Sequence, residues 1–187
     1  MTCYTVAMIK FILLGFLNYQ PMTGYDLKQM IDGSTAHFWH AHHSQIYTTL
    51  RKMEEEGLVT SVFVKDESAP DRRVYTITED GKKALSDWLD QSMTETVQIK
   101  EKLLVRIFFS ARRNPQDVLT ELHLQHQLHQ EQMAAYQKLV KEMPHKHLHP
   151  GLERDAIFWR ATLEMGMRYE EMYLGWLNDT IQIIENL

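Results

Sequence analysis

Cysteine is almost absent from this chain of 187 residues, in which the single cysteine is Cys3. One cysteine cannot form a disulfide within the chain, and it cannot supply the paired ligands of a CxxC metal site. The sequence also lacks a glycine-rich phosphate loop, a GxSxG elbow and an HExxH zinc motif. These absences indicate a protein that is not an enzyme, and we expect neither a cofactor nor a dedicated metal site.

Histidine is the residue type that argues for a metal, because the chain has ten of them. They gather in three groups, which are His37, His40, His42 and His43, then His123, His126 and His129, then His145, His147 and His149. No group has a cysteine partner, and the last falls in a predicted loop. We interpret these histidines as polar surface and helix-end residues.

A long apolar run is also missing. The segment from Val6 to Leu17 is interrupted by Lys10, lacks a signal-peptide cleavage site and is too short to span a bilayer. We therefore expect a cytoplasmic protein with no membrane partner. The formal net charge of −5 argues against a protein that coats nucleic acid indiscriminately. It permits a specific DNA-binding protein, which needs positive charge only on the face that meets phosphate.

Apolar residues at helical spacing predict three helices in the amino-terminal half, over residues 5–18, 24–31 and 44–56. Thr23 is the predicted N-cap of the second helix, and Gly57 the left-handed end of the third. Beyond Gly57 the period changes to two, which predicts strands over 58–64 and 73–78 joined by a polar turn. Thr78 then caps a fourth helix that reaches about residue 90. Three helices followed by a two-stranded wing are typical of a winged helix-turn-helix.

The third helix of such a domain enters the major groove, so its outer face is the candidate reading surface. With Ile46, Leu50 and Met53 turned inward, the residues that face outward or flank that face are Ser44, Gln45, Tyr47, Thr48, Arg51 and Lys52. Arginine is the best single reader of guanine, and lysine is a natural phosphate contact. We expect Tyr47 to pack its ring and direct its hydroxyl to phosphate.

The wing carries a second basic group. Lys65, Arg72 and Arg73 fall in or beside the predicted turn, where they concentrate positive charge at the tip of the hairpin. We expect all three to contact the DNA backbone or minor groove.

The polar run 91–96 is the predicted boundary between two domains, 1–91 and 97–187. The second domain reads as helix throughout, over residues 100–113, 115–143 and 152–185. Asn114 and Pro115 form the N-cap and first position of the middle helix.

The last helix carries two apolar seams, each following an alternating spacing of three and four residues. One seam includes Leu163, Met167, Leu174, Leu177, Ile181 and Ile184. The other includes Phe158, Met165, Tyr169, Met172, Trp176 and Ile183. A helix with two apolar seams must be covered twice, so we assign one seam to the helix's own subunit and the second to the partner in a homodimer.

Three strings resemble the PadR family of transcriptional regulators across its winged-helix domain. They are LLGFLNYQPMTGYDLKQMID, HFWHAHHSQIYTTLRKMEEEGLVTSVFV and PDRRVYTITEDGKKALSDWL. The carboxy-terminal half, through EKLLVRIFF and the tryptophan-rich last helix, resembles the longer subgroup whose helical tail pairs two subunits. Thr48 departs from the pattern, since similar sequences commonly have proline there; the threonine adds a donor and a methyl group to the reading face.

The resemblance implies a dimeric cytoplasmic regulator, usually a repressor, with Gln45, Tyr47, Arg51 and the wing basics facing DNA. We therefore predict a mainly α protein with a small two-stranded β-wing, in which a winged helix-turn-helix domain precedes a helical dimerisation domain. Its partners would be double-stranded DNA, bound at an inverted-repeat operator, and a second copy of itself. The alternative is a winged-helix module that binds a protein surface instead of DNA.

The resemblance leaves the effector open, because some relatives respond to phenolic acids and others to drugs. A small apolar or aromatic molecule is the expected class. The residues that we consider for such a pocket are Phe38, Trp39, Trp159 and Met165.

Overall fold

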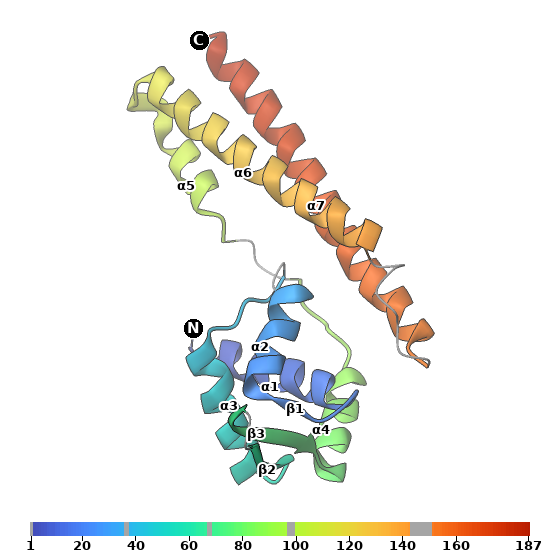
Figure 1. The fold of residues 1–187 in the computed structure, drawn as a ribbon. Helices are drawn as coiled ribbons and strands as arrows, with labels where there is room; N and C mark the ends of the chain where they lie inside the picture. The colour runs from blue at the N-terminus through green and yellow to red at the C-terminus, as the bar shows by residue number, and fades with distance from the viewer. Residues whose placement is uncertain (1, 36–37, 67–68, 97–99, 143–150) are drawn as a thin grey trace. The chain divides into compact units, whose positions relative to one another are not determined.

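A computed structural model describes residues 2–35, 38–66, 69–96, 100–142 and 151–187 of the chain. It contains two compact units, Met1–Thr96 and Val97–Leu187 (Figure 1). The first unit comprises α1 (Thr2–Leu17), β1 (Met22–Thr23), α2 (Gly24–Gly33), α3 (His43–Glu55), β2 (Val59–Asp66), β3 (Ala69–Ile77) and α4 (Glu79–Leu89). The second comprises α5 (Lys102–Phe108), a 3-10 turn (Ser110–Arg112), α6 (Pro115–Glu142) and α7 (Glu153–Glu185). In the described ranges, no helix is long and apolar enough to cross a membrane.

The core of the first unit lies where α1, α2 and α3 meet. Its fully buried side chains include Leu13 of α1, Leu27 of α2 and Leu50 of α3. Ile46 and Met53 are buried beside Leu50, so the predicted inward stripe of α3 is confirmed. Because one face of α3 is committed to this core, its opposite face is presented to solvent.

Side chains predicted to cap helices do so. Thr23 begins α2 with a capping box, in which its hydroxyl accepts from the Asp26 backbone N–H at 3.1 Å and the Asp26 carboxylate accepts from the Thr23 backbone N–H at 2.9 Å. Thr78 accepts from the Gly81 backbone N–H at 3.1 Å at the start of α4. Gly57 follows α3 with a φ of +73°, the left-handed conformation that favours glycine.

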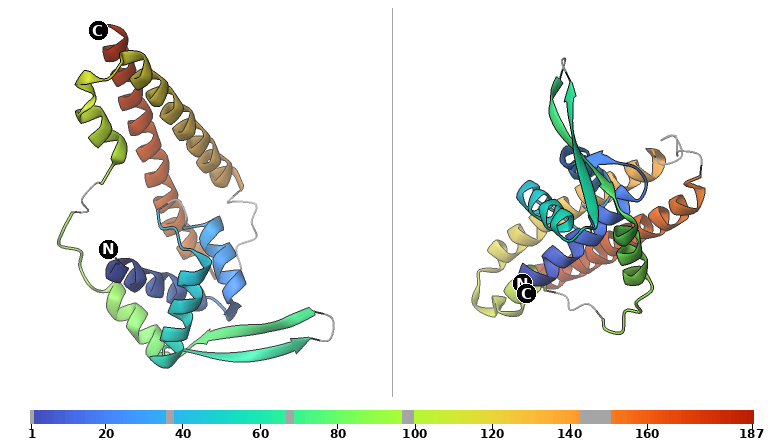
Figure 2. Two further views of the ribbon diagram at one scale, coloured as in Figure 1. Left: turned by 90° about the vertical axis from the view of Figure 1, so that its left-hand side faces the viewer. Right: turned by 90° about the horizontal axis from the view of Figure 1, so that it is seen from below.

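The sheet has three strands in the order β1–β3–β2, so the prediction of two strands was incomplete. In the added strand, Met22 pairs with Tyr75 and Thr23 with Val74. A two-residue strand shows no alternation, and sequence periodicity therefore cannot detect it. The hairpin of β2 and β3 is also longer than predicted and projects from the helices of its unit (Figure 2).

The second unit is built on α6 and α7, which lie side by side (Figures 1 and 2). One cluster of buried residues in its core consists of Leu103, Val118, Leu122, Tyr173, Leu177 and Ile181. The predicted helix over 100–113 is wrong in its second half, since α5 ends at Phe108 and a 3-10 turn follows. At this break the Ser110 hydroxyl donates to the Arg106 carbonyl at 2.7 Å, and a side chain that bonds the backbone in this way competes with continuation of the helix.

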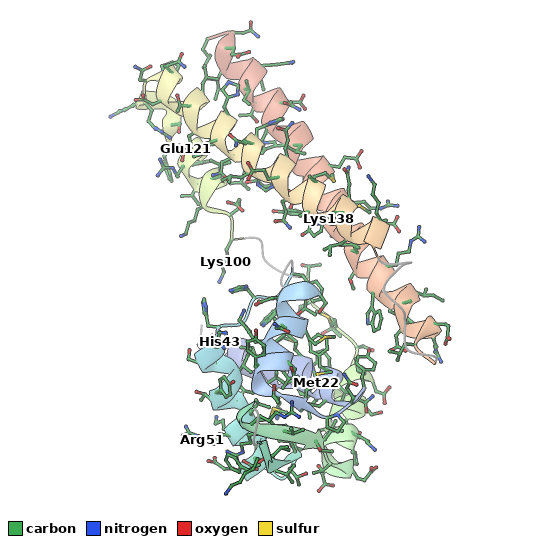
Figure 3. All side chains as sticks on the ribbon, viewed as in Figure 1. Met22, His43, Arg51, Lys100, Glu121 and Lys138 are labelled. Carbon is green, nitrogen blue, oxygen red and sulfur yellow. The ribbon has the colours of Figure 1, made fainter. Side chains whose placement is uncertain are left out.

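Two carboxylates of the second unit each pair with a basic side chain of another segment. Glu121 of α6, labelled in Figure 3, accepts from Arg106 and Arg113, and the hydrogen bond from Arg113 is the largest cause of its lowered pKa. Glu170 of α7 is 5% exposed and lies 2.5 Å from Nδ1 of His129 on α6. The His129 ring stacks on Tyr173, and burial raises the pKa of Tyr173 to about 12. These pairs tie α5 and α7 to α6.

Candidate nucleic-acid interface

The outer face of α3 carries most of the predicted reading residues. Its exposed side chains are Ser44, Tyr47, Thr48, Arg51 and Lys52. Within the described part of the chain, Arg51 and Lys52 form no ion pair. His43 begins the helix, and Arg51 lies near its other end (Figure 3). The face therefore presents hydroxyl donors and two uncommitted cations to solvent, as base edges and phosphates require.

Gln45 differs from the other predicted reading residues. It is half-buried, and its side-chain oxygen accepts from the His42 backbone N–H at 2.9 Å, which caps the start of α3. Sequence reasoning placed Gln45 beside the reading face but missed this role, although a glutamine at the third position of a helix is typical of a capping box.

The Tyr47 ring packs against the start of α2 and remains 47% exposed. A Cβ built on Gly24 would lie 2.6 Å from the ring atom Cε1 and 3.1 Å from the hydroxyl oxygen of Tyr47. The His43 ring stacks on the Tyr47 ring, with the two ring centroids 6.5 Å apart. Tyr47 thus contacts both Gly24 and His43, with room at Gly24 only for a hydrogen.

Replacing Gly24 by alanine should displace the Tyr47 ring without unfolding the protein, since the clash involves the end of a side chain and alanine favours helix. We expect DNA affinity to fall about threefold to tenfold, equivalent to about 0.7–1.4 kcal/mol, while the melting temperature changes little. Gly33→Ala is the matched control, because a Cβ at Gly33 meets nothing within 4 Å at the other end of the same helix. Equal DNA affinity of both variants and the wild type would show that the ring position is unimportant.

The basic residues of the wing separate into two kinds. Lys65 and Arg72 are exposed, and their contacts to DNA stay a prediction. Arg73 is half-buried within β3 and forms an ion pair with Glu54 of α3, so its expected position at a free hairpin tip was wrong. The physical reason is that β3 already begins at Ala69, so Arg73 lies within the strand. Side chains alternate along a strand, and Arg73 therefore faces the side opposite to that of Arg72.

Arg73 also affects a buried tyrosine. Tyr75 lies on the same face of β3, and its ring centroid is 5.5 Å from the guanidinium carbon. Burial raises the pKa of Tyr75, and the positive charge of Arg73 opposes that rise.

The two apolar seams of α7 have different surroundings in the single chain. Leu163, Leu177 and Ile181 of one seam are buried within the second unit. In the other seam the exposed fraction reaches 65% at Met165, and the exposed residues are Phe158, Met165, Tyr169, Met172 and Ile183. Trp176 is the exception, since it is half-buried against its own core and packs edge-on to Tyr173.

Apolar side chains are also exposed on α5 and at the residue that follows it, where sequence reasoning assigned no pairing role. They are Leu104, Val105, Phe108 and Phe109. The signal was present in the run LLVRIFF, which is too uniformly apolar for a short helix that buries only Leu103.

The structure describes some of the residues considered for a metal site and all four considered for an effector pocket. No group of three or more His, Cys, Asp or Glu side chains in the described ranges could hold a metal ion. The predicted loop histidines His145, His147 and His149, and His37 near α3, lie outside the described residues. Of the four residues considered for an effector pocket, Trp39 packs on the first core, Trp159 is half-buried, and Phe38 and Met165 are exposed.

Comparison with known proteins finds a family match for each unit. Residues 13–87 match the Transcriptional regulator PadR-like family, and residues 99–185 match the family Virulence activator alpha C-term. A curated relative, the negative transcriptional regulator PadR of Bacillus subtilis, is 25% identical over 95% of this chain and 97% of its own length.

Two solved structures of Bacillus subtilis PadR have the same fold. The first, in complex with operator DNA, superimposes with a TM-score of 0.82 at 22% identity, covering 95% of this chain and 99% of the other. The second, in complex with p-coumaric acid, gives a TM-score of 0.77 at 23% identity, covering 96% and 97%.

Proposed function

The chain belongs to the PadR-like family of transcriptional regulators, which are DNA-binding proteins and not enzymes, and from this premise we propose that it acts as a homodimeric repressor. The proposed dimer binds an inverted-repeat operator by placing α3 of each subunit in the major groove. The observation that carries the proposal is the exposed face of α3. Arg51 and Lys52 form no ion pair with any residue that the structure describes, and they share this helix with the exposed side chains of Ser44 and Thr48.

In this proposal the residues divide by role. Arg51 reads a guanine edge, and Thr48 offers a hydroxyl and a methyl group to a neighbouring base. Lys52, Tyr47, Lys65 and Arg72 contact phosphate, and Gln45 orients the start of the helix. The negative regulator of Bacillus subtilis supports the assignment of repression, because it resembles this chain over nearly the full length of both.

Pairing is proposed to use the exposed seam of α7 with the apolar residues of α5. Soluble monomers rarely expose large apolar patches, and a second copy would cover the exposed apolar side chains of these helices. The domains proposed to carry the two activities are 1–91 for DNA binding and 97–187 for dimerisation. We also propose an aromatic effector, for which the complex of Bacillus subtilis PadR with p-coumaric acid is the support.

Gel-shift titration tests this function most cheaply. The protein should retard fragments from upstream of its own gene at nanomolar concentration and leave scrambled fragments of equal composition unshifted until about a thousandfold higher concentration. p-Coumaric acid should release the bound fragment if it represents the effector class. A protein that shifts no fragment preferentially would instead favour the winged-helix module that binds a protein surface.

A further inference from the structure

We propose that Arg73 is a positioning residue that fixes the wing against the carboxyl end of α3 through Glu54. The proposal rests on the function above, in which α3 and the wing contact the same half-site. Its consequence is that Arg73 sets the separation between base reading and backbone contact, and does not itself bind phosphate.

Three side chains form a closed hydrogen-bonded network between the hairpin and α3. Arg73 Nη2 donates to Glu54 Oε2 at 2.5 Å, and Arg73 Nε donates to Ser61 Oγ at 2.7 Å. The Ser61 hydroxyl in turn donates to Glu54 Oε1 at 2.6 Å. Both oxygens of the Glu54 carboxylate therefore accept a hydrogen bond. One donor, Ser61, belongs to β2, and the other, Arg73, belongs to β3.

Aromatic rings hold the guanidinium in this orientation. The guanidinium carbon of Arg73 lies 5.3 Å from the ring centroid of Phe63 and 5.5 Å from that of Tyr75. Phe63 is the cross-strand partner of Arg73, so the two side chains share a face of the hairpin. The planar guanidinium of arginine can stack on aromatic rings while it donates hydrogen bonds to two acceptors. The ammonium group of lysine cannot do both in the same way.

The network lies where the hairpin loses its third strand. β1 pairs with β3 only at Tyr75 and Val74, and from Arg73 outward β2 and β3 pair with each other alone. A two-stranded hairpin has marginal stability in water and would move relative to the body of the domain. Arg73 and Ser61 therefore attach the hairpin to α3 at the position where support from β1 ends.

The surroundings of Glu54 favour positioning over phosphate contact. The side chains of Glu54 and Arg73 are 29% and 39% exposed, so neither is fully solvated. Turning Arg73 toward phosphate would leave the Glu54 carboxylate partly buried without its cation, facing a second anion. Arg72 is exposed, has the opposite orientation in β3 and needs no such exchange.

Glu54→Gln tests the proposal, with Glu55→Gln as the matched control. Both remove one negative charge from the end of α3, but Glu55 is exposed and lies outside the network. The probes are a duplex that the wild type selects from random DNA and a scrambled duplex. We expect Glu54→Gln to reduce the ratio of the two affinities about fivefold to tenfold, and Glu55→Gln to leave it unchanged. If Glu54 instead restrained a phosphate-binding Arg73, Glu54→Gln would raise both affinities and preserve the ratio, which would overturn the proposal.

Amide hydrogen exchange in the free protein gives a second test that needs no DNA. Arg73→Lys should accelerate amide exchange by about tenfold in the outer part of the hairpin, which lies between Ser61 of β2 and Arg73 of β3. Arg72→Lys should leave this exchange rate unchanged. Unchanged exchange in Arg73→Lys would contradict the proposal even if DNA binding is confirmed. A wild type that selects no duplex would refute the proposed function, and the exchange measurement would still decide whether Arg73 holds the hairpin.

Discussion

A chain that carries Met165→Glu together with Met172→Glu is expected to be monomeric at micromolar concentration, where the wild type is expected to be a dimer. Both side chains are exposed in the single chain and belong to the seam assigned to the partner. Dimerisation would bury these carboxylates without cations, which is strongly unfavourable. Because a monomer engages only one half-site, its operator affinity should fall about a hundredfold or more. Light scattering and gel-shift titration measure the two effects.

The control adds the same charge to a different side of α7. Asn178→Asp with Gln182→Glu changes two exposed polar positions outside the seam assigned to the partner. This variant should remain a dimer with nearly normal operator affinity. Circular dichroism should show full helical content in both variants, since none of the four positions belongs to the core. A dimeric Met165→Glu, Met172→Glu variant would contradict the assignment of this seam to pairing.

Arg51→Ala should cost about 1–3 kcal/mol of binding free energy on the operator and much less on unrelated DNA. The exposed position of Arg51 on α3, without an ion-pair partner in the described residues, suits paired hydrogen bonds to guanine. Arg72→Ala should instead weaken binding to all sequences alike. Affinity should also depend less steeply on salt. The slope of log affinity against log salt concentration should become smaller by about one unit for each phosphate contact that a subunit loses.

Titrating both arginine variants against operator and scrambled DNA at several salt concentrations separates reading from phosphate contact. The roles would have to be exchanged if Arg51→Ala lowered both affinities equally while Arg72→Ala changed base preference. Melting temperatures should stay close to wild type, because both side chains are exposed and outside the core.

Helices and their caps were predictable because their causes are local. The core stripe of α3 follows from the spacing of Ile46, Leu50 and Met53, and all three are buried. Thr23 and Thr78 were identified as caps from residue type and position alone, and both accept the expected backbone hydrogen bond. Such features depend on residues within one turn of each other, which a single sequence displays directly.

Two of the features that the sequence did not reveal depend on residues far apart in the chain. β1 exists only because Met22 and Thr23 meet β3, which comes much later in the sequence. Arg73 was grouped with Arg72 as a tip residue because its partner Glu54, 19 residues away, cannot be inferred from the spacing. The early end of α5 depends on a side-chain bond that competes weakly with helix and leaves no periodic signal.

The two seams of α7 lie between these cases. Their spacing predicted that the helix would be covered on two sides, and the structure buries one seam within the chain while leaving most of the other exposed. Trp176 could not be assigned from spacing, because it falls in the exposed seam by number and yet packs beside Tyr173 at the edge of the core.

Hydroxyl-radical footprinting of the wild-type protein on its selected duplex tests the central claim most directly, since it reports both the groove contacts and the symmetry of the complex. A dimer that presents two copies of α3 should protect two half-sites of an inverted repeat, with centres about 10 base pairs apart or a multiple of that distance. Protection of a single unpaired half-site at full affinity would contradict the account.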